Sequence, residues 1–229
     1  MLTLEPVAHI HSDFPTKFGI PRQSGLVEEL EALVVFEPPW RDDNALRGIE
    51  GFSHLWLIWE FSQSPRGSWS PTVRPPRLGG NRRVGVFASR SPFRPNPLGL
   101  SCVRLLGLEK LPGQGTALRV GGADLLDGTP IYDIKPYQPL SDSHPDARGG
   151  FATAVAAHHL AVRFPPELAA RVPAAKLPAL TALLAQDPRP QYQHRPDRVY
   201  GLEFGPLEVK FTVEGELLTV RQVQDGRCG

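Results

Sequence analysis

The chain has 229 residues, a formal net charge of +1 and a hydrophobic fraction of 41%. This length fits one large domain, or one domain with a small appendage, and the hydrophobic fraction excludes a disordered chain. The start lacks a basic region followed by an apolar block, so no signal peptide is expected, and no run is long enough to cross a membrane. The simple expectation is a soluble cytoplasmic protein.

Short β-like runs dominate the first part of the chain. The most apolar run, Phe52–Phe61, is rich in aromatic and β-branched residues and predicts a buried strand. Phe14–Leu26 is expected to be a loop, and Asn44–Ile49 one helical turn. The other predicted strands are Val7–His11, Ala32–Phe36, Arg83–Ala88, Ser101–Leu106, Ala117–Val120 and Pro130–Ile134. The Pro- and Gly-rich connectors favour an antiparallel sheet or barrel, and no alternation with long helices indicates a doubly wound sheet.

A polar stretch at Ser141–Gly150 marks the expected domain boundary. It separates a catalytic unit of residues 1–142 from a smaller unit of residues 151–229. The second unit is expected to be α+β because its leucines recur at helical spacing before a series of β-like runs. Its predicted elements are helices at Pro166–Ala174 and Lys176–Gln186 and strands at Val199–Phe204, Leu207–Val213 and Leu217–Val220.

The positive charge is concentrated in one span. Residues 61–108 contain no Asp, Glu, Lys or His, yet they carry eight arginines. An ordinary solvated surface mixes both signs of charge, and Arg suits phosphates, planar anions and stacked bases. The span therefore predicts a site for an anionic ligand, most simply nucleic acid. The alternative is that these arginines pair with acidic residues elsewhere in the fold.

Three loops could carry chemistry. Pro21-Arg22-Gln23 offers a guanidinium and an amide in a fixed turn, although a plain surface turn would use the same residues. Asp127-Gly128-Thr129-Pro130 predicts a tight turn in which Gly128 allows a ligand to approach the backbone. Asp133 and Lys135 follow on one strand face, where they could pair with each other.

The third loop is Asp187-Pro188-Arg189-Pro190, whose two prolines present a charged pair rigidly. Such a pair suits recognition of a ligand, and a salt bridge between domains would use it equally well. No dinucleotide fingerprint, P-loop or zinc-type Cys and His spacing is present. From the residues alone the expectation is a β-rich protein with an Arg-lined anion site, no metal and no assigned reaction.

Four strings in this sequence resemble the TrmO (TsaA-like) family. They are Phe52–Trp56, Pro71–Asn81, Gly85–Pro97 and Asp127–Tyr137, and Asp187–Tyr192 resembles the C-terminal motif of the same family. The resemblance implies a bacterial tRNA methyltransferase that uses S-adenosylmethionine. It implies methylation of N6 of the threonylcarbamoyl-adenosine at position 37 (t6A), beside the anticodon, to give m6t6A. It further implies a β-barrel catalytic domain and a homodimer with the cofactor near the subunit interface.

Carried over motif by motif, the resemblance implies two sets of binding residues. Ser62 stands where the family has a histidine, so the resemblance implies a contact between the cofactor and the backbone of Ser62, not its side chain. The implied cofactor contacts are Pro21, Arg22, Gln23, Ser62, Gln63, Arg90, Leu100, Gly128, Thr129, Pro130 and Ile131. The arginines would grip the anticodon loop and the threonyl carboxylate, and the expected tRNA contacts are Arg74, Arg77, Arg82, Arg83, Arg94, Arg189 and Tyr192.

The N6 atom is a poor nucleophile because it is conjugated to a carbonyl, so its proton must be removed around the transition state. Asp127, Asp133 and Asp187 are the candidate bases, and the sequence does not choose among them. It also leaves open which tRNAs are preferred and whether the C-terminal motif acts in its own subunit or in the partner's. Two rival functions are an RNA-binding module without catalysis and a same-fold methyltransferase with another substrate.

Overall fold

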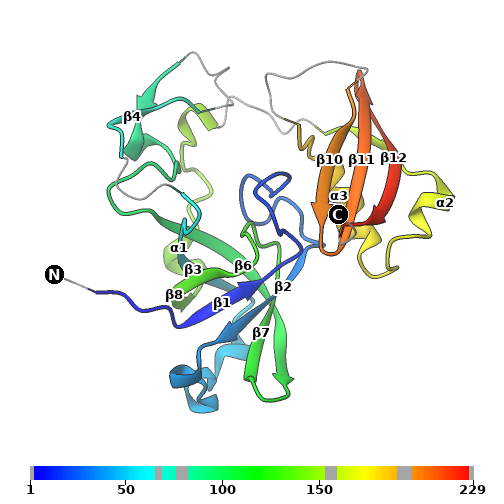
Figure 1. Cartoon of the computed structure of the whole chain (residues 1–229). Helices are drawn as coiled ribbons and strands as arrows, with labels where there is room; N and C mark the ends of the chain where they lie inside the picture. Colours follow the sequence, from blue (N-terminus) through cyan, green and yellow to red (C-terminus); the bar gives the residue numbers. More distant parts are fainter. Residues whose placement is uncertain (1–2, 65–68, 76–81, 153–158, 190–197, 227–229) are drawn as a thin grey trace.

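A computed structural model describes residues 3–64, 69–75, 82–152, 159–189 and 198–226. Most regular elements in these ranges are strands, and the helices are short (Figure 1). The predicted mainly β character is confirmed. In the described ranges, no helix is long and apolar enough to span a membrane.

Six strands form a closed barrel in the order β1-β2-β7-β6-β3-β8, with every neighbouring pair antiparallel. Each strand lies where a β-like run predicts one, but β6 is more than twice as long as its prediction. The strands are β1 (Ala8–His11), β2 (Glu31–Phe36), β3 (His54–Glu60), β6 (Leu98–Leu111), β7 (Gly115–Gly121) and β8 (Thr129–Pro136).

Strand β3 lies where the sequence predicts a buried strand, and it is buried on one face. Leu55, Leu57 and Trp59 point into the core, and the residues between them are half-buried. Successive side chains of a strand point to opposite faces, so a barrel strand exposes every second residue. The inward residues belong to the first hydrophobic cluster, which fills the barrel.

The expected helical turn at Asn44–Ile49 is replaced by two 3-10 turns, η2 (Asp43–Leu46) and η3 (Ile49–Gly51). Gly48 separates them at φ 87°, a left-handed conformation that interrupts a helix and suits glycine. Other short helical segments among the described residues of the first part are η1 (Pro38–Trp40), α1 (Pro139–Asp142) and η6 (Gly150–Ala152).

A two-stranded ribbon projects from the barrel at the upper left of Figure 1. It consists of β4 (Thr72–Val73) and β5 (Val84–Gly85), followed by η5 (Val86–Ala88). The strand predicted over Arg83–Ala88 is therefore wrong beyond Gly85. The ribbon pairs with no barrel strand in the described ranges, so nothing extends its ladder, and the chain turns into the 3-10 segment instead.

The second part of the chain forms a sheet in the order β10-β11-β12-β9. Its first three strands were predicted, whereas β9 was missed because three residues give too short a pattern. Helix α2 covers four residues of the nine predicted; Pro173 follows it closely and cannot continue a helix. The elements are β9 (Ala161–Arg163), α2 (Pro166–Ala169), α3 (Leu177–Ala185), β10 (Tyr200–Phe204), β11 (Leu207–Glu214) and β12 (Leu217–Asp225).

The second hydrophobic cluster joins this sheet to a loop from the other end of the chain. Phe14, Val27 and Leu30 are buried in it, and the Phe14 ring packs edge-on against Phe204 with centroids 6.2 Å apart. A Cβ on Gly19 would come within 2.0 Å of the Leu202 side chain, so glycine is required at this crossing. The loop between β1 and β2 is therefore packed against both parts of the molecule.

Candidate functional site

A cavity of about 550 Å³ lies where the β1–β2 loop, the end of β3, the start of β6 and the loop after η5 meet. This volume is within the range of small-molecule sites, roughly 300–1,000 Å³. The apolar lining residues include Trp59, Phe61, Leu98, Leu100 and Leu126. The polar and charged lining residues are Lys17, Arg22, Gln23, Glu60, Ser62, Gln63, Ser64, Ser89, Arg90, Arg94, Asp124 and Thr129.

The cavity gathers most of the residues that the family resemblance implied as cofactor contacts. Those that line it are Pro21, Arg22, Gln23, Ser62, Gln63, Arg90, Leu100 and Thr129. Gly128, Pro130 and Ile131 are not among the lining residues. Ile131 is fully buried in the barrel core, and the Gly128 N–H donates to the Ile10 carbonyl at 2.8 Å, so both serve the junction of β1 and β8.

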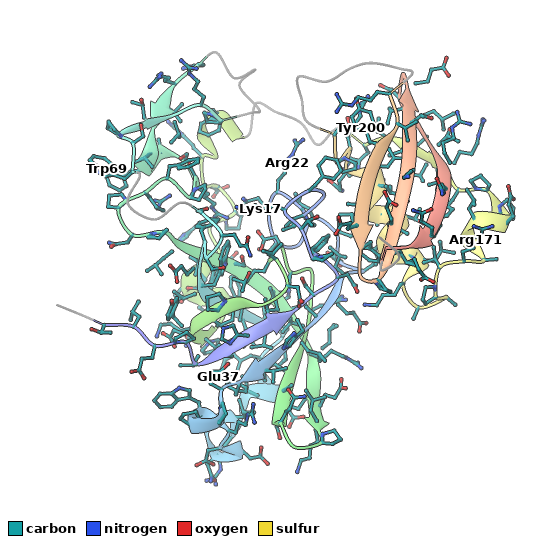
Figure 2. The ribbon with its side chains drawn as sticks, in the orientation of Figure 1. Lys17, Arg22, Glu37, Trp69, Arg171 and Tyr200 are labelled. Atoms are coloured by element: carbon teal, nitrogen blue, oxygen red, sulfur yellow. The ribbon has the colours of Figure 1, made fainter. Side chains whose placement is uncertain are left out.

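The first wall of the cavity is the loop that carries Lys17 and Pro21-Arg22-Gln23. Below it, Phe14, Phe18 and Ile20 pack in the second hydrophobic cluster. The Lys17 ammonium donates to the Gln63 carbonyl at 2.6 Å, which ties the loop to the segment after β3. Figure 2 shows Arg22 extending from this loop away from the barrel. The fixed turn expected from the sequence is therefore supported by packing from outside the barrel.

The second wall is the loop Ser89–Arg94. Arg94 donates from Nη1 to the backbone carbonyls of Ser89 and Ser91 at 3.0 and 3.2 Å, so its guanidinium holds the loop together. Arg90 donates to the Gln23 side-chain oxygen and so bridges the two walls. A charged donor thus lines the cavity, and a guanidinium suits an anionic group of a ligand.

Asp124 is a cavity residue that the sequence analysis missed. Its Oδ1 accepts a 2.6 Å hydrogen bond from the Ser101 hydroxyl, and Ser101 in turn accepts one of 3.0 Å from the Trp59 indole N–H. Burial raises the pKa of Asp124, while hydrogen bonds from Ser101 and backbone N–H groups, and the charge of Arg90, act in the opposite direction. Its neighbours Gly121-Gly122-Ala123 belong to no known motif, so no local pattern marks it.

The three candidate bases lie outside the cavity lining. Asp127 accepts from the Ser12 N–H at 3.1 Å and lies 3.4 Å from His11 Nδ1. Asp133 pairs with Lys135 at 2.8 Å, which is the mutual pairing that their shared strand face allowed. Asp127 is the nearest of these in sequence to the site, since Leu126 and Thr129 on either side of it line the cavity.

Asp187 and Arg189 form a bidentate ion pair, with Nε–Oδ1 at 2.7 Å and Nη2–Oδ2 at 2.8 Å. Arg189 is 8% exposed, and the hydrogen bonds that it donates to Asp187 raise its pKa above the usual value. Asp187 has φ 51°, a left-handed conformation unusual for a residue with a side chain. The charged pair expected from the sequence is therefore present, and Asp187 holds the Arg189 guanidinium in a largely buried position.

The arginines of residues 61–108 are mostly not neutralised by acids. Among those that the structure describes, only Arg104 has an acidic partner within 4.0 Å, Glu28 at 3.9 Å. Arg74, Arg82 and Arg83 lie at the ribbon, where Arg83 donates to the Thr72 hydroxyl at 3.0 Å. Arg77 and Tyr192, two of the expected tRNA contacts, lie outside the described residues.

The geometry is that of a mainly β protein with a cofactor-sized cavity beside a group of arginines. The family model described as "tRNA-methyltransferase O N-terminal domain" matches residues 9–143, and that described as "TrmO C-terminal domain" matches residues 157–226. The chain therefore belongs to the tRNA-methyltransferase O family.

Curated relatives agree with this assignment. The chain is 45% identical over 195 residues to the tRNA (adenine(37)-N6)-methyltransferase of Escherichia coli K12, which covers 82% of this chain and 83% of that protein. It is 49% identical over 174 residues to the enzyme of the same name from Eikenella corrodens, covering 75% and 97%. A Pseudomonas aeruginosa protein whose name places it among S-adenosylmethionine-dependent methyltransferases is 43% identical, with 90% of each chain covered.

Solved structures give the same result for the fold. A crystal structure of TrmO from P. aeruginosa matches with a TM-score of 0.80 at 36% identity, covering 99% of this chain and 98% of that one. A second crystal structure of TrmO matches with a TM-score of 0.79 at 34% identity, covering 97% and 99%. Both parts of the chain are thus included in the likeness.

Proposed function

We propose that this chain transfers a methyl group from S-adenosylmethionine to N6 of the threonylcarbamoyl-adenosine at position 37 of tRNA, forming m6t6A. As a member of its family the chain is an S-adenosylmethionine-dependent methyltransferase that acts on tRNA adenine 37. The t6A form of the substrate is the finer part of the proposal. The observation that carries the cofactor assignment is the cavity, because eight of the eleven expected contacts line it.

The lining residues fit this cofactor. Trp59, Phe61 and Leu100 offer an apolar wall for the adenine ring and the methylene groups beside the sulfonium, and Gln23, Arg90 and Asp124 offer polar partners for the polar ends of the cofactor. When bound, S-adenosylmethionine supplies an electrophilic methyl group on a sulfonium. The cavity residues then do the positioning on which an in-line displacement depends.

Proton balance requires that N6 lose a proton as the new C–N bond forms and the S–C bond electrons stay on sulfur. Asp127, Asp133 and Asp187 remain the proposed candidates for accepting that proton. Asp127 is favoured by position, because the two neighbours Leu126 and Thr129 reach the cavity. Asp133 pairs with Lys135 and Asp187 pairs with Arg189, and neither carboxylate is flanked by residues that line the cavity.

The anionic substrate is proposed to lie over the ribbon and the second cavity wall. Arg82 and Arg83 are exposed there, and Trp69 and Phe93 are exposed aromatic groups suited to stacking on bases. Figure 2 shows Trp69 beside the ribbon. We include Arg74, Arg77, Arg94, Arg189 and Tyr192 among the proposed tRNA contacts.

The assembly is part of the same proposal. The chain is proposed to act as a cytoplasmic homodimer, with a catalytic domain of residues 1–142 and a second domain of residues 151–229. Two separate hydrophobic clusters support the division, although the second one includes part of the β1–β2 loop. In a dimer, the Asp187–Arg189 pair is proposed to reach the partner's site.

Arg189→Ala should strongly reduce methylation while the variant still folds and binds the cofactor, at some cost in stability because Arg189 is 8% exposed and pairs with Asp187. If the motif acts across subunits, mixing this variant with an Arg90→Ala partner should restore about one working site per heterodimer. Subunit-exchanged mixtures that recover no activity, although both variants fold and dimerise, would place the motif in its own subunit.

The proposed reaction is tested with tRNA that carries or lacks t6A. Mass spectrometry of the digested tRNA should detect a methyl addition only when t6A, S-adenosylmethionine and the protein are all present. Equal methylation of both tRNAs would reject the t6A requirement. The rival function, an RNA-binding module without catalysis, predicts no binding of S-adenosylmethionine in calorimetry.

A further inference from the structure

Asp124 is a carboxylate that lines the cavity and whose hydrogen-bond partners are all uncharged. In the part of the chain that the structure describes, no basic side chain lies within 4.0 Å of it. Asp124 is half-buried, and withdrawing a carboxylate from water without a cationic partner is unfavourable, so such a group normally has a reason to be retained. The Ser101 hydroxyl, itself 1% exposed, and backbone N–H groups fix one side of it.

The relay that orients Asp124 begins in the cavity wall. Trp59 donates to Ser101, and Ser101 donates to Asp124, so the aromatic wall and the carboxylate are held in one arrangement. A Cβ on Gly99 would lie 2.3 Å from the Trp59 ring, which shows how closely this strand approaches the indole. The other lining carboxylate, Glu60, accepts from the Tyr132 hydroxyl at 2.6 Å and extends from β3 on the side opposite to Trp59.

Arg90 supplies the opposite charge at the same cavity, on the second wall. The charge of Arg90 acts to lower the pKa of Asp124, yet the two side chains do not form an ion pair. Arg90 donates a hydrogen bond to Gln23 instead. A separated cation and anion facing one cavity are complementary to a zwitterion. The amino-acid end of S-adenosylmethionine is such a group, with an ammonium and a carboxylate on one carbon.

We propose that Asp124 binds the α-ammonium group of the cofactor while Arg90 binds its α-carboxylate. The assignment rests on the proposed function, since it presumes that the cavity holds S-adenosylmethionine. Asp124 then acts in cofactor recognition, and the proton of N6 is taken by another group. Ser101 is a positioning residue, because it aims the carboxylate and touches no ligand atom in this arrangement.

Calorimetry with two probes tests this assignment. S-adenosylhomocysteine carries the amino-acid end, and 5′-methylthioadenosine lacks it. Asp124→Asn should weaken S-adenosylhomocysteine binding by about ten- to a hundredfold, because a charged contact is lost, and should leave 5′-methylthioadenosine binding within about twofold. Ser101→Ala keeps the charge and should weaken S-adenosylhomocysteine alone by about two- to tenfold, which also serves if Asp124→Asn does not fold.

Asp43→Asn is the matched control. Asp43 also accepts a 2.6 Å hydrogen bond from a hydroxyl on a barrel strand, that of Thr116, but it does not line the cavity. It should bind both probes like the wild type. If this control also weakens S-adenosylhomocysteine, the loss in Asp124→Asn is not specific and the assignment fails.

Three other results of the calorimetry would overturn the assignment of Asp124 or reject the proposed cofactor. Loss of both probes in Asp124→Asn would overturn the assignment, because the adenosine end would then depend on Asp124 as well. Unchanged S-adenosylhomocysteine affinity would also overturn it, and a large fall in methylation rate with that affinity intact would assign Asp124 to proton transfer instead. A wild-type protein that binds neither probe would reject the proposed cofactor itself, which is a different failure from that of Asp124.

Discussion

The two walls of the cavity are stabilised in different ways. The wall at Lys17–Gln23 rests on buried aromatic and aliphatic side chains of the second hydrophobic cluster, among them Phe14. The wall at Ser89–Arg94 follows a ribbon outside the barrel and is held by local hydrogen bonds. The Ser89 hydroxyl donates to the Val86 carbonyl and accepts from the Ser91 N–H, and Arg94 donates to the Ser89 carbonyl. The first wall thus depends on tertiary packing and the second on local hydrogen bonds. Substitutions under the first wall should therefore lower the stability of the protein, whereas substitutions in the second wall should affect mainly ligand binding.

The largest expected effect follows from removing the packing under the first wall. Phe14 is 1% exposed, and Phe14→Ala should lower the free energy of unfolding by about 3–5 kcal/mol and weaken cofactor binding. Phe87, on the ribbon side, is 77% exposed, and Phe87→Ala should change stability by less than about 0.5 kcal/mol. Urea denaturation of both variants measures the difference. Equal effects would show that the walls do not differ in this way.

The second prediction removes the guanidinium that bridges the walls. Arg90→Ala should cost about 1.5–3 kcal/mol of cofactor binding, because a charge-assisted contact is lost, with little change in stability. Arg82→Ala, an exposed arginine outside the cavity lining, is the control and should bind the cofactor normally. Calorimetry reads the affinity and thermal unfolding reads the stability. Turnover and affinity like those of the wild type in folded Arg90→Ala would refute this role.

The third prediction concerns the ribbon as a surface for RNA. Replacing Arg74 and Arg82 together with Ala should reduce the slope of log affinity for tRNA against log salt by roughly two, one for each lost phosphate contact. Cofactor affinity should stay unchanged, because neither residue lines the cavity. Binding titrations at several salt concentrations provide the measurement. An unaltered slope would mean that these arginines contact no phosphate.

The smallest effect is expected at the ion pair between the β1–β2 loop and the segment before α3. Lys176 Nζ lies 2.6 Å from Asp13 Oδ2, but the lysine side chain is 40% exposed, so solvent screens the attraction. Lys176→Ala should therefore cost no more than about 1 kcal/mol of stability. Asp13 also accepts from the Gly205 N–H through its backbone carbonyl, and that contact survives the substitution. A loss as large as that of Phe14→Ala would show that charge, not packing, holds the first wall.

The sequence by itself determined the mainly β character, the approximate place of the barrel strands and the residues on which the family resemblance rests. Those features are local, since alternation, turn residues and motif strings lie within short windows. It left open whether the arginines of residues 61–108 pair with acidic residues, and among the described ones only Arg104 has such a partner within 4.0 Å.

Only the tertiary structure decided which of those residues meet. It places Phe14, from a predicted loop, in the core of the second sheet, and it brings Asp124, which lies in no motif, to the cavity through Ser101. It keeps Ile131 in the barrel core and pairs Asp133 with Lys135. These outcomes depend on strand register and on contacts between residues far apart in the chain, and a pattern read along the sequence contains neither.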